Sequence, residues 1–251
     1  MKHIYIGDEG KGSPLVLIHG FLGSSKMWEP QINFFKDHFR VITPDLPGFG
    51  KSNKAKSHNN IQSIANLLLD CLDEKKIDKF YLLGHSMGGM IVQEMAKISG
   101  NKIIKLICYS TGPRGEMPGR FETVDQSREN LKKNGLEITA KNIAKTWFVK
   151  GEEAEHFDIC VEAGKQPSIE TVDNAFVAFK NWDGVETLKN IKNETLIVWG
   201  NKDKSYNLDQ VQTLNKNIPN SSLFIFEGCA HNVHLERPEE FNRTILNYLN
   251  K

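Results

Sequence analysis

The sequence predicts an α/β fold with a mainly parallel sheet. Short apolar runs recur along the 251-residue chain, and most are continuous rather than alternating, as expected of strands covered on both faces. Amphipathic segments with the period of a helix separate several of these runs. Strands that alternate with helices are typical of this class. The expected strands are residues 3–6, 14–18, 39–43, 79–83, 103–109, 195–199 and 222–226.

Three helices are expected from the spacing of apolar residues. In the first, Ile61, Ile64 and Leu68 fall on one stripe, and residues 87–99 show similar spacing. In the third, Pro238 occupies a position that suits the first turn of a helix. The first strand is expected to pair antiparallel with the second through the turn at 7–12.

Residues 112–185 contain no convincing strand between the runs at 103–109 and 195–199. A structureless loop of that length is implausible inside a compact domain, so we expect an inserted helical lid. The glycine- and proline-rich stretch 112–120 is expected to be the flexible lead-in to it. The expected division is a core of 1–111, a lid of 112–185 and a second part of the core at 186–251.

Composition limits the partners and the compartment. The net charge is +1 and the lysines are scattered, which leaves no basic stripe for nucleic acid or an anionic membrane. No apolar stretch approaches the roughly 18 residues of a membrane span. The amino terminus lacks the apolar core of a secretory signal. We therefore expect a cytoplasmic protein that acts on a small molecule.

The stretch YLLGHSMGGMI (81–91) places Ser86 between Gly84 and Gly88 in a G-x-S-x-G pattern. A serine on a sharp turn between strand and helix projects its hydroxyl above the sheet edge, and the glycines remove Cβ atoms that would clash there. Some chains of this composition match the pattern by chance. Here, however, it follows an expected strand and precedes an expected helix. We predict that Ser86 is a nucleophile; the alternative is an ordinary serine in a glycine-rich turn.

A serine nucleophile needs a base, and histidine has the nearest suitable pKa. His231 and His234 lie in the loop after the last expected strand, where the carboxyl ends of α/β strands place ligand sites. His231 is favoured because it is closer to the strand end, and His234 is the alternative. His85 lies in the elbow, and we expect its side chain to point away from the active face.

An acid must fix the tautomer of the base. Asp203 lies three residues past Gly200, beyond the carboxyl end of another expected strand. Asp209, Asp173 and Asp183 are alternatives that are less directly placed. The resulting chain order of serine, acid and histidine is the one expected of this architecture.

Acyl transfer also needs donors for the developing oxyanion. The N–H of Met87, just after the nucleophile, is one expected donor, and the N–H of Phe21 in the loop after 14–18 is the other. His19 and Gly20 are expected to shape that loop, and a purely structural turn is the alternative.

The lid contributes aromatic residues that predict an apolar acyl or aryl pocket, although such a stripe also suits simple packing. Arg114, Arg120 and Arg128 are candidates for contact with a substrate carboxylate, or are merely solvated. The residues expected to bind substrate are Trp147, Phe148, Phe176, Phe179 and Trp182.

The chain resembles the α/β-hydrolase superfamily in the segments LVLIHGFLGSSKMW, VITPDLPGFGKS, LLGHSMGGM, LIVWGNKD and GCAHNVHLERPEEF. The resemblance implies a seven- or eight-stranded sheet with flanking helices, a helical cap inserted after the sixth strand, and no cofactor or metal. Relatives that dehalogenate or open epoxides use aspartate at the elbow, so Ser86 argues against both reactions.

These observations predict a carboxylesterase-like serine hydrolase that cleaves small to medium acyl or aryl esters through an acyl-enzyme. The alternative is hydrolysis of a C–C bond in meta-ring-fission products, or opening of an enol-lactone, by the same triad. Those relatives usually carry a more glycine-rich first loop than HGFLGSSKMW. A third hypothesis is a non-catalytic binding protein on the same scaffold.

Overall fold

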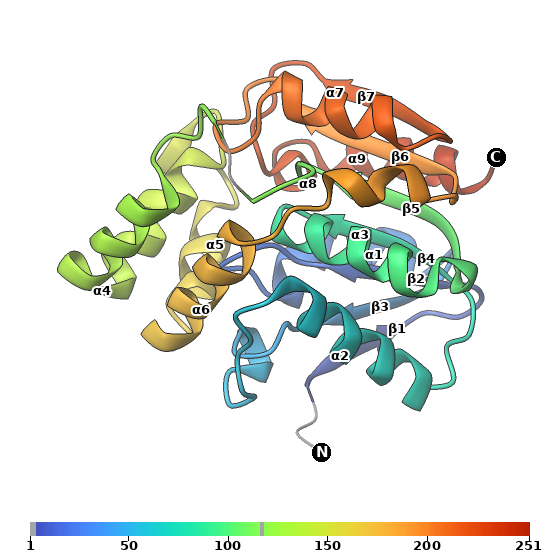
Figure 1. Ribbon diagram of the computed structural model, residues 1–251, viewed down its shortest axis with the longest axis horizontal. Helices are drawn as coiled ribbons and strands as arrows, with labels where there is room; N and C mark the ends of the chain where they lie inside the picture. Colours follow the sequence, from blue (N-terminus) through green and yellow to red (C-terminus); the bar gives the residue numbers. More distant parts are fainter. Residues whose placement is uncertain (1–3, 116–117) are drawn as a thin grey trace.

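The computed structural model describes residues 4–115 and 118–251. Its core is a seven-stranded sheet in the order β1-β3-β2-β4-β5-β6-β7 (Figure 1). β1 runs antiparallel to β3, and the other neighbouring strands run parallel. The strands are β1 (Ile6–Glu9), β2 (Pro14–Ile18), β3 (Arg40–Pro44), β4 (Phe80–His85), β5 (Ile103–Tyr109), β6 (Thr195–Gly200) and β7 (Ser221–Phe226).

The expected place and partner of the first strand were wrong. β1 occupies part of the expected turn at 7–12 and pairs with β3, from Ile6 opposite Pro44 to Glu9 opposite Val41. Residue 3, where the strand was expected to begin, lies outside the described residues. β2 already pairs with β3 on one edge and β4 on the other, so of β2 and β3 only β3 has an edge left for β1. The Arg40–Asp8 ion pair joins the two strands.

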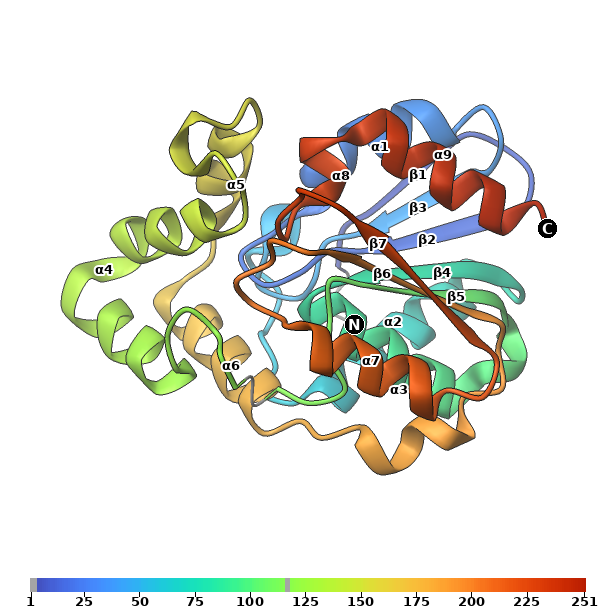
Figure 2. The ribbon, with the colours of Figure 1, turned by 90° about the horizontal axis from the view of Figure 1, so that it is seen from above.

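Helices cover both faces of the sheet, as the continuous apolar strands predicted (Figure 2). α1 (Glu29–Phe35) and α9 (Pro238–Leu249) lie on one face, with the short α8 (Val233–Glu236) before α9. α2 (Ile61–Glu74), α3 (Met87–Ser99) and α7 (Leu208–Asn217) lie on the other. Short 3-10 helices occur at Ser25–Trp28, Gly50–Ser52, Gly100–Lys102, Gly151–Glu153 and Val185–Asn190.

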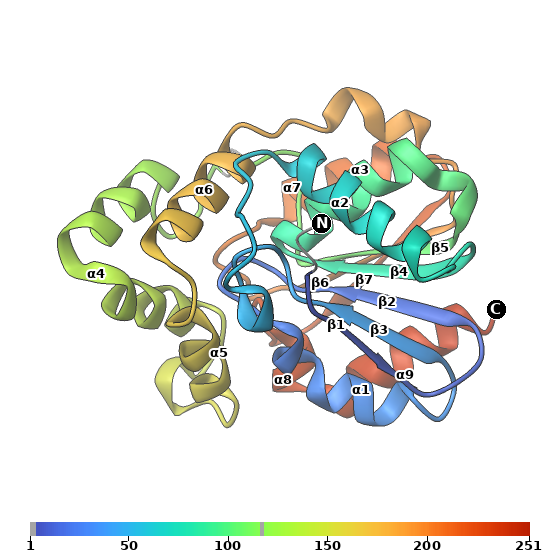
Figure 3. The ribbon, with the colours of Figure 1, turned by 90° about the horizontal axis from the view of Figure 1, so that it is seen from below.

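A helical insertion leaves the sheet between β5 and β6 and lies beside it (Figure 3). It consists of α4 (Val124–Thr146), α5 (Phe157–Gly164) and α6 (Ile169–Lys180). Five described strands precede the insertion. The expectation of a cap after the sixth strand refers to the eight-stranded form of the fold, which has one more strand before the cap. Within the expected lead-in, residues 116–117 lie outside the described part, and the domain limits at 112 and 185 stay a prediction.

Side-chain caps explain where several helices begin. The Thr123 hydroxyl accepts the N–H of Gln126 while the Gln126 amide oxygen accepts the N–H of Thr123, a reciprocal box that starts α4. Asn207 and Gln210 form the same box at α7. Gly135, with φ of 78°, interrupts α4, so the helix changes direction there. No helix in the described ranges is long and apolar enough to cross a bilayer.

Candidate active site

The β4–α3 junction forms a strained elbow at Ser86. Ser86 has φ of 57° and ψ of −118°, a left-handed conformation that is costly for a residue with a side chain. A Cβ at Gly84 would collide with the Gly88 carbonyl, and a Cβ at Gly88 would collide with the Ile18 carbonyl. The Ser86 N–H donates to the Tyr109 carbonyl at 2.9 Å, which ties the turn to β5. The strain at Ser86 therefore persists because its surroundings leave no alternative path for the chain.

Asp203 and His231 form a buried pair between the loops after β6 and β7. The His231 Nδ1 lies 2.8 Å from the Asp203 Oδ2, and the two side chains are 2% and 0% exposed. The other carboxylate oxygen accepts the N–H groups of Ser205 at 2.7 Å and Tyr206 at 3.2 Å. A carboxylate only accepts hydrogen bonds, so Nδ1 carries the ring proton and Nε2 of the neutral ring carries the lone pair.

Ser86 and His231 line one small cavity of about 30 Å³. Among the described residues, no hydrogen bond joins the side chains of Ser86 and His231. Catalytic hydrogen bonds of this kind are often long in unliganded enzymes and tighten when substrate binds. The other lining residues are Phe21, Met87, Arg120, Ile143, Trp147, Phe179, Ser205 and Tyr206.

The two expected oxyanion donors come from different elements that meet at the cavity. Met87 begins α3, so its N–H has no acceptor within the helix and lies at the positive end of the helix dipole. Phe21 lies in the loop after β2, and its N–H has no acceptor among residues 4–115 and 118–251. His19 shapes that loop: its Nε2 accepts the Leu46 N–H at 2.9 Å, so its Nδ1 donates to the Gly20 carbonyl at 2.8 Å.

The backbone of His231 is held from behind by two buried side chains. The His231 carbonyl accepts a hydrogen bond from the Nε2 of His85 at 3.1 Å and another from the Tyr109 hydroxyl at 3.1 Å. Burial raises the pKa of Tyr109 well above its usual value, which keeps its proton in place for this bond. His85 thus points away from the cavity, as expected, and contacts the histidine loop.

His234, the alternative base, belongs to this supporting layer. Its Nδ1 lies 3.0 Å from the Tyr109 hydroxyl oxygen, which also accepts the His234 N–H at 3.1 Å. Because the Tyr109 proton goes to the His231 carbonyl, the Nδ1 of His234 must be the donor. Its ring packs on Trp28 with centroids 4.6 Å apart. The structure therefore places His234 behind the cavity and His231 at its wall.

The aromatic residues of the insertion divide into two groups. Trp147 and Phe179 line the cavity, as expected for substrate contact. Phe148, Phe176 and Trp182 lie outside its wall, which differs from the expectation. Phe148 packs on Phe157, Phe176 packs on Phe21 with centroids 4.5 Å apart, and the Trp182 Nε1 donates to the Glu94 Oε1 at 2.9 Å. Helical spacing shows which side chains share a face of the helix but not which of them line a cavity.

Three residues of the cavity wall were not predicted to bind substrate. Tyr206 stacks on His231 with ring centroids 5.8 Å apart and 15° between the planes. Burial raises the pKa of Tyr206, and contacts of its hydroxyl with Ser86 and Thr111 offset part of that rise. An aromatic residue three positions after Asp203 was the available signal for it. The three are Ile143, Ser205 and Tyr206; Arg120, one of the three arginines considered for a substrate carboxylate, also lines the cavity.

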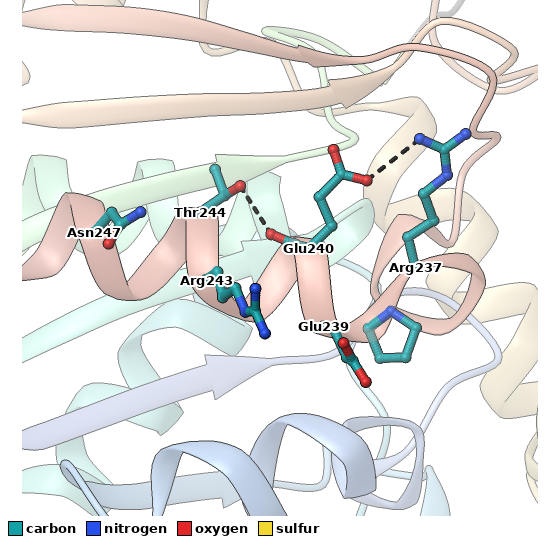
Figure 4. Close-up of a pocket in the computed structure, with 7 residues that line it drawn as sticks. Arg237, Glu239, Glu240, Arg243, Thr244 and Asn247 are labelled. Carbon is teal, nitrogen blue, oxygen red and sulfur yellow. Dashed lines mark hydrogen bonds and ion pairs between the residues drawn. The ribbon is translucent and has the colours of Figure 1, made fainter.

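Larger hollows on the surface lack this chemistry. A groove along α9 is lined by side chains of that helix and the residue before it, including the Arg237–Glu240 ion pair (Figure 4). It contains no nucleophile next to a base. Within the described ranges, no group of three or more His, Cys, Asp or Glu side chains is placed to hold a metal ion.

The fold and the cavity together define a class of protein: a hydrolase with an α/β sheet, an elbow after its fourth strand and a helical insertion. The chain belongs to the alpha/beta hydrolase fold family, whose model matches residues 13–238. Most of the core and the whole insertion fall within that match.

Known proteins of several activities are similar to this chain. A pimeloyl-[acyl-carrier protein] methyl ester esterase of Legionella pneumophila is 30% identical, over 95% of this chain and 96% of the relative. A 2-hydroxy-6-oxononadienedioate/2-hydroxy-6-oxononatrienedioate hydrolase of Pseudomonas putida is 29% identical, over 98% and 92%. Among solved structures, an esterase from Exiguobacterium antarcticum matches with a TM-score of 0.91 and 25% identity, over 99% and 96%.

The buried layer behind His231 predicts the effect of removing one hydroxyl. Tyr109→Phe leaves the His234 N–H and Nδ1–H buried without their acceptor, so we expect a loss of about 1–3 kcal/mol in the free energy of unfolding. Urea unfolding measures it. Tyr81→Phe on β4 is the matched control, because its hydroxyl makes no side-chain hydrogen bond in the described ranges, and we expect a change within about 0.5 kcal/mol. Equal losses in the two variants would contradict the role given to Tyr109.

The buried histidines also predict how stability depends on pH. Burial lowers the pKa of His19, and lowers those of His85 and His234 well below the usual value. In the unfolded chain these rings titrate near pH 6.5, so below that pH the unfolded state binds more protons than the folded state. The free energy of unfolding should fall as the pH falls below about 6.5, by at most about 1.4 kcal/mol per pH unit for each ring.

Urea unfolding between about pH 7.5 and about pH 5.5 checks this slope, a range that lies above the titration of ordinary carboxylates. In His234→Gln the slope should be shallower, because one of the three rings is gone. A free energy of unfolding that stays constant over this range contradicts the neutral, buried state of these histidines.

Proposed function

We propose that this protein hydrolyses carboxylic esters through an acyl-enzyme on Ser86. The observation that carries the proposal is the meeting of three elements at one cavity: the strained serine, the Asp203–His231 pair and two N–H groups without acceptors. Each component is needed for acyl transfer, and together they come from the segments that follow β2, β4, β6 and β7 at the carboxyl edge of the sheet.

The proposed reaction has two halves. The Ser86 oxygen attacks the ester carbonyl as the Nε2 of His231 takes the hydroxyl proton, and the N–H groups of Phe21 and Met87 stabilise the oxyanion. Collapse of the tetrahedral intermediate breaks the C–O bond, and the imidazolium gives its proton to the leaving alcohol. Water then attacks the acyl-enzyme by the same route and releases the acid. Asp203 holds the imidazole tautomer and stabilises the imidazolium.

The cavity wall supports small to medium acyl or aryl groups as substrates. Phe21, Ile143, Trp147 and Phe179 supply apolar surface, and the cavity is small, at about 30 Å³. The similar proteins of Legionella pneumophila and Exiguobacterium antarcticum are both esterases, which also supports ester hydrolysis.

A second candidate is hydrolysis of a C–C bond by the same residues. It is favoured by the Pseudomonas putida relative, which is nearly as similar to this chain as the esterase is. A dienone acid presents a carbonyl to Ser86 just as an ester does, but its leaving group is a carbon that must be protonated. Comparing rates on a dienone acid and on simple esters decides between the two.

Removing the nucleophile tests the mechanism. Ser86→Ala should lose about 10⁴-fold or more in kcat on a nitrophenyl ester, because the base and the acid act through that oxygen. An organophosphonate should label the wild type at one residue per chain and leave Ser86→Ala unlabelled, as mass spectrometry would show. Ser222→Ala, an exposed position at the opposite end of β7, is the control and should retain activity. Full activity in Ser86→Ala would falsify the proposal.

Enlarging the cavity tests the placement of the acyl group. In Phe179→Ala, kcat/KM for a nitrophenyl octanoate relative to the butyrate should rise about tenfold or more, since one or two methylene groups in an apolar pocket are worth this much. Phe148→Leu changes a buried aromatic residue outside the cavity, so it should leave the ratio within about twofold of wild type. If both variants shift the ratio alike, Phe179 does not bound the acyl site.

A further inference from the structure

Three arginines in and near the insertion differ in their partners. Arg114 lies 3.6 Å from the Asp183 carboxylate. Arg128 makes a two-point contact with Asp173, at 2.7 Å from Nε and 3.0 Å from Nη2. Arg120 has no carboxylate within 4.0 Å among residues 4–115 and 118–251. Of these three, it is the arginine whose charge the described chain leaves without a direct ion pair.

Arg120 is also the arginine that reaches the candidate active site. It lines the cavity with Ser86 and His231, and no other cationic side chain of the described residues does so, apart from His231 when protonated. It also lines an outer groove with Pro118, Val124 and Lys180. Arg120 therefore stands between the cavity and the outside surface, where a substrate would pass or extend.

Contacts within the chain fix the guanidinium on one edge and leave the other edge available. Nη1 donates to the Glu122 carbonyl at 2.7 Å and to the Ser127 hydroxyl at 3.0 Å, and the group lies 4.2 Å over the Phe121 ring. These contacts use both hydrogens of Nη1. Nε and Nη2 keep three N–H groups that have no acceptor in the described ranges.

The remaining edge suits a carboxylate. A carboxylate matches Nε and Nη2 with two parallel hydrogen bonds. This chain uses the same edge for its own two-point pairs, Arg128 with Asp173 and Arg40 with Asp8. Arg120 is half-buried, and the loss of water around it lowers its pKa, while Glu122 and Tyr206 counter the effect. A partly buried cation gains more from an anionic partner than an exposed one does.

We propose that Arg120 binds a carboxylate on the substrate, so that the preferred substrates are short esters that keep one free carboxylate. This inference rests on the proposed ester hydrolysis and names the substrate class for it. The ester carbonyl lies at Ser86 and the carboxylate at Arg120, and both residues line the same small cavity, which favours a short spacer. Monoesters of short dicarboxylic acids are the simplest members of the class.

The test compares two substrates of equal length on matched variants. Monomethyl glutarate carries the carboxylate, and methyl pentanoate replaces it with a methyl group; a pH-stat follows acid release from both. The measured quantity is the ratio of kcat/KM for the first to kcat/KM for the second. Arg120→Gln should lower this ratio about 10- to 100-fold, mainly through KM. A change of this size corresponds to the free energy of hydrogen bonds to a charged group. Arg120→Lys should keep part of it.

Arg128→Gln is the matched control, because it removes an arginine of the insertion that already has a carboxylate partner; the ratio should stay within about twofold of wild type. A second readout uses the wild type alone, so it does not depend on the folding of a variant. Glutarate should inhibit hydrolysis of nitrophenyl acetate competitively, and raising the salt concentration should weaken that inhibition.

The outcomes separate this inference from the proposed function. If the wild type hydrolyses nitrophenyl esters but shows no preference for monomethyl glutarate and no inhibition by glutarate, ester hydrolysis stands and the carboxylate site is refuted. An equal ratio in wild type and Arg120→Gln refutes it as well. If the wild type hydrolyses none of these esters, the proposed function fails first. A fall in the ratio that is confined to the Arg120 variants supports the site.

Discussion

The close approach of α3 to the sheet at Gly84 and Gly88 is the constraint on which the rest of the site depends. Gly88 lies against the carbonyls of Ile18 and His19, so the start of α3 meets the end of β2 with no side chain between them. This contact brings the N–H of Met87 and the loop that carries Phe21 to the same side of Ser86. One steric requirement therefore positions the serine and both expected oxyanion donors together.

The histidine loop depends on polar groups buried behind it. His85 and Tyr109 donate hydrogen bonds to the His231 carbonyl, and the Tyr109 hydroxyl also accepts from His234. These hydrogen bonds fix the tautomers of the His85 and His234 rings. Such a network stabilises one arrangement only when its members are satisfied. The His234 Nε2 and the Trp28 Nε1 have no partner among the described residues, which makes this layer sensitive to substitution.

The insertion is tied to the same loop. The Asn232 N–H donates to the Trp147 carbonyl at 3.0 Å, and the Val149 N–H donates to the Glu236 Oε1 at 2.7 Å. The Glu236 Oε2 accepts the Ala230 N–H at 2.6 Å. The end of α4, which carries a cavity wall at Trp147, is therefore attached to the residues on either side of His231. Movement of the insertion would change the cavity and the histidine loop together.

The sequence by itself determined most of the sheet and the three candidate catalytic residues. Continuous apolar runs report burial on both faces, and parallel strands end at one edge, so residues just after β4, β6 and β7 had to lie near one another. Ser86, Asp203 and His231 were accessible to that reasoning because each lies one to five residues past a strand.

Only the tertiary structure decided which side chains face the cavity and which edge β1 joins. Phe176 and Phe179 share a helical face, yet Phe176 packs against Phe21 while Phe179 lines the cavity, because a rotation within one face changes the neighbour. Arg114, Arg120 and Arg128 look alike in sequence, and their partners lie at distant positions of the chain. β1 pairs with β3 because β2 has no open edge. Periodicity reports that a residue is buried, but its partner is set by the packing of segments far apart in sequence.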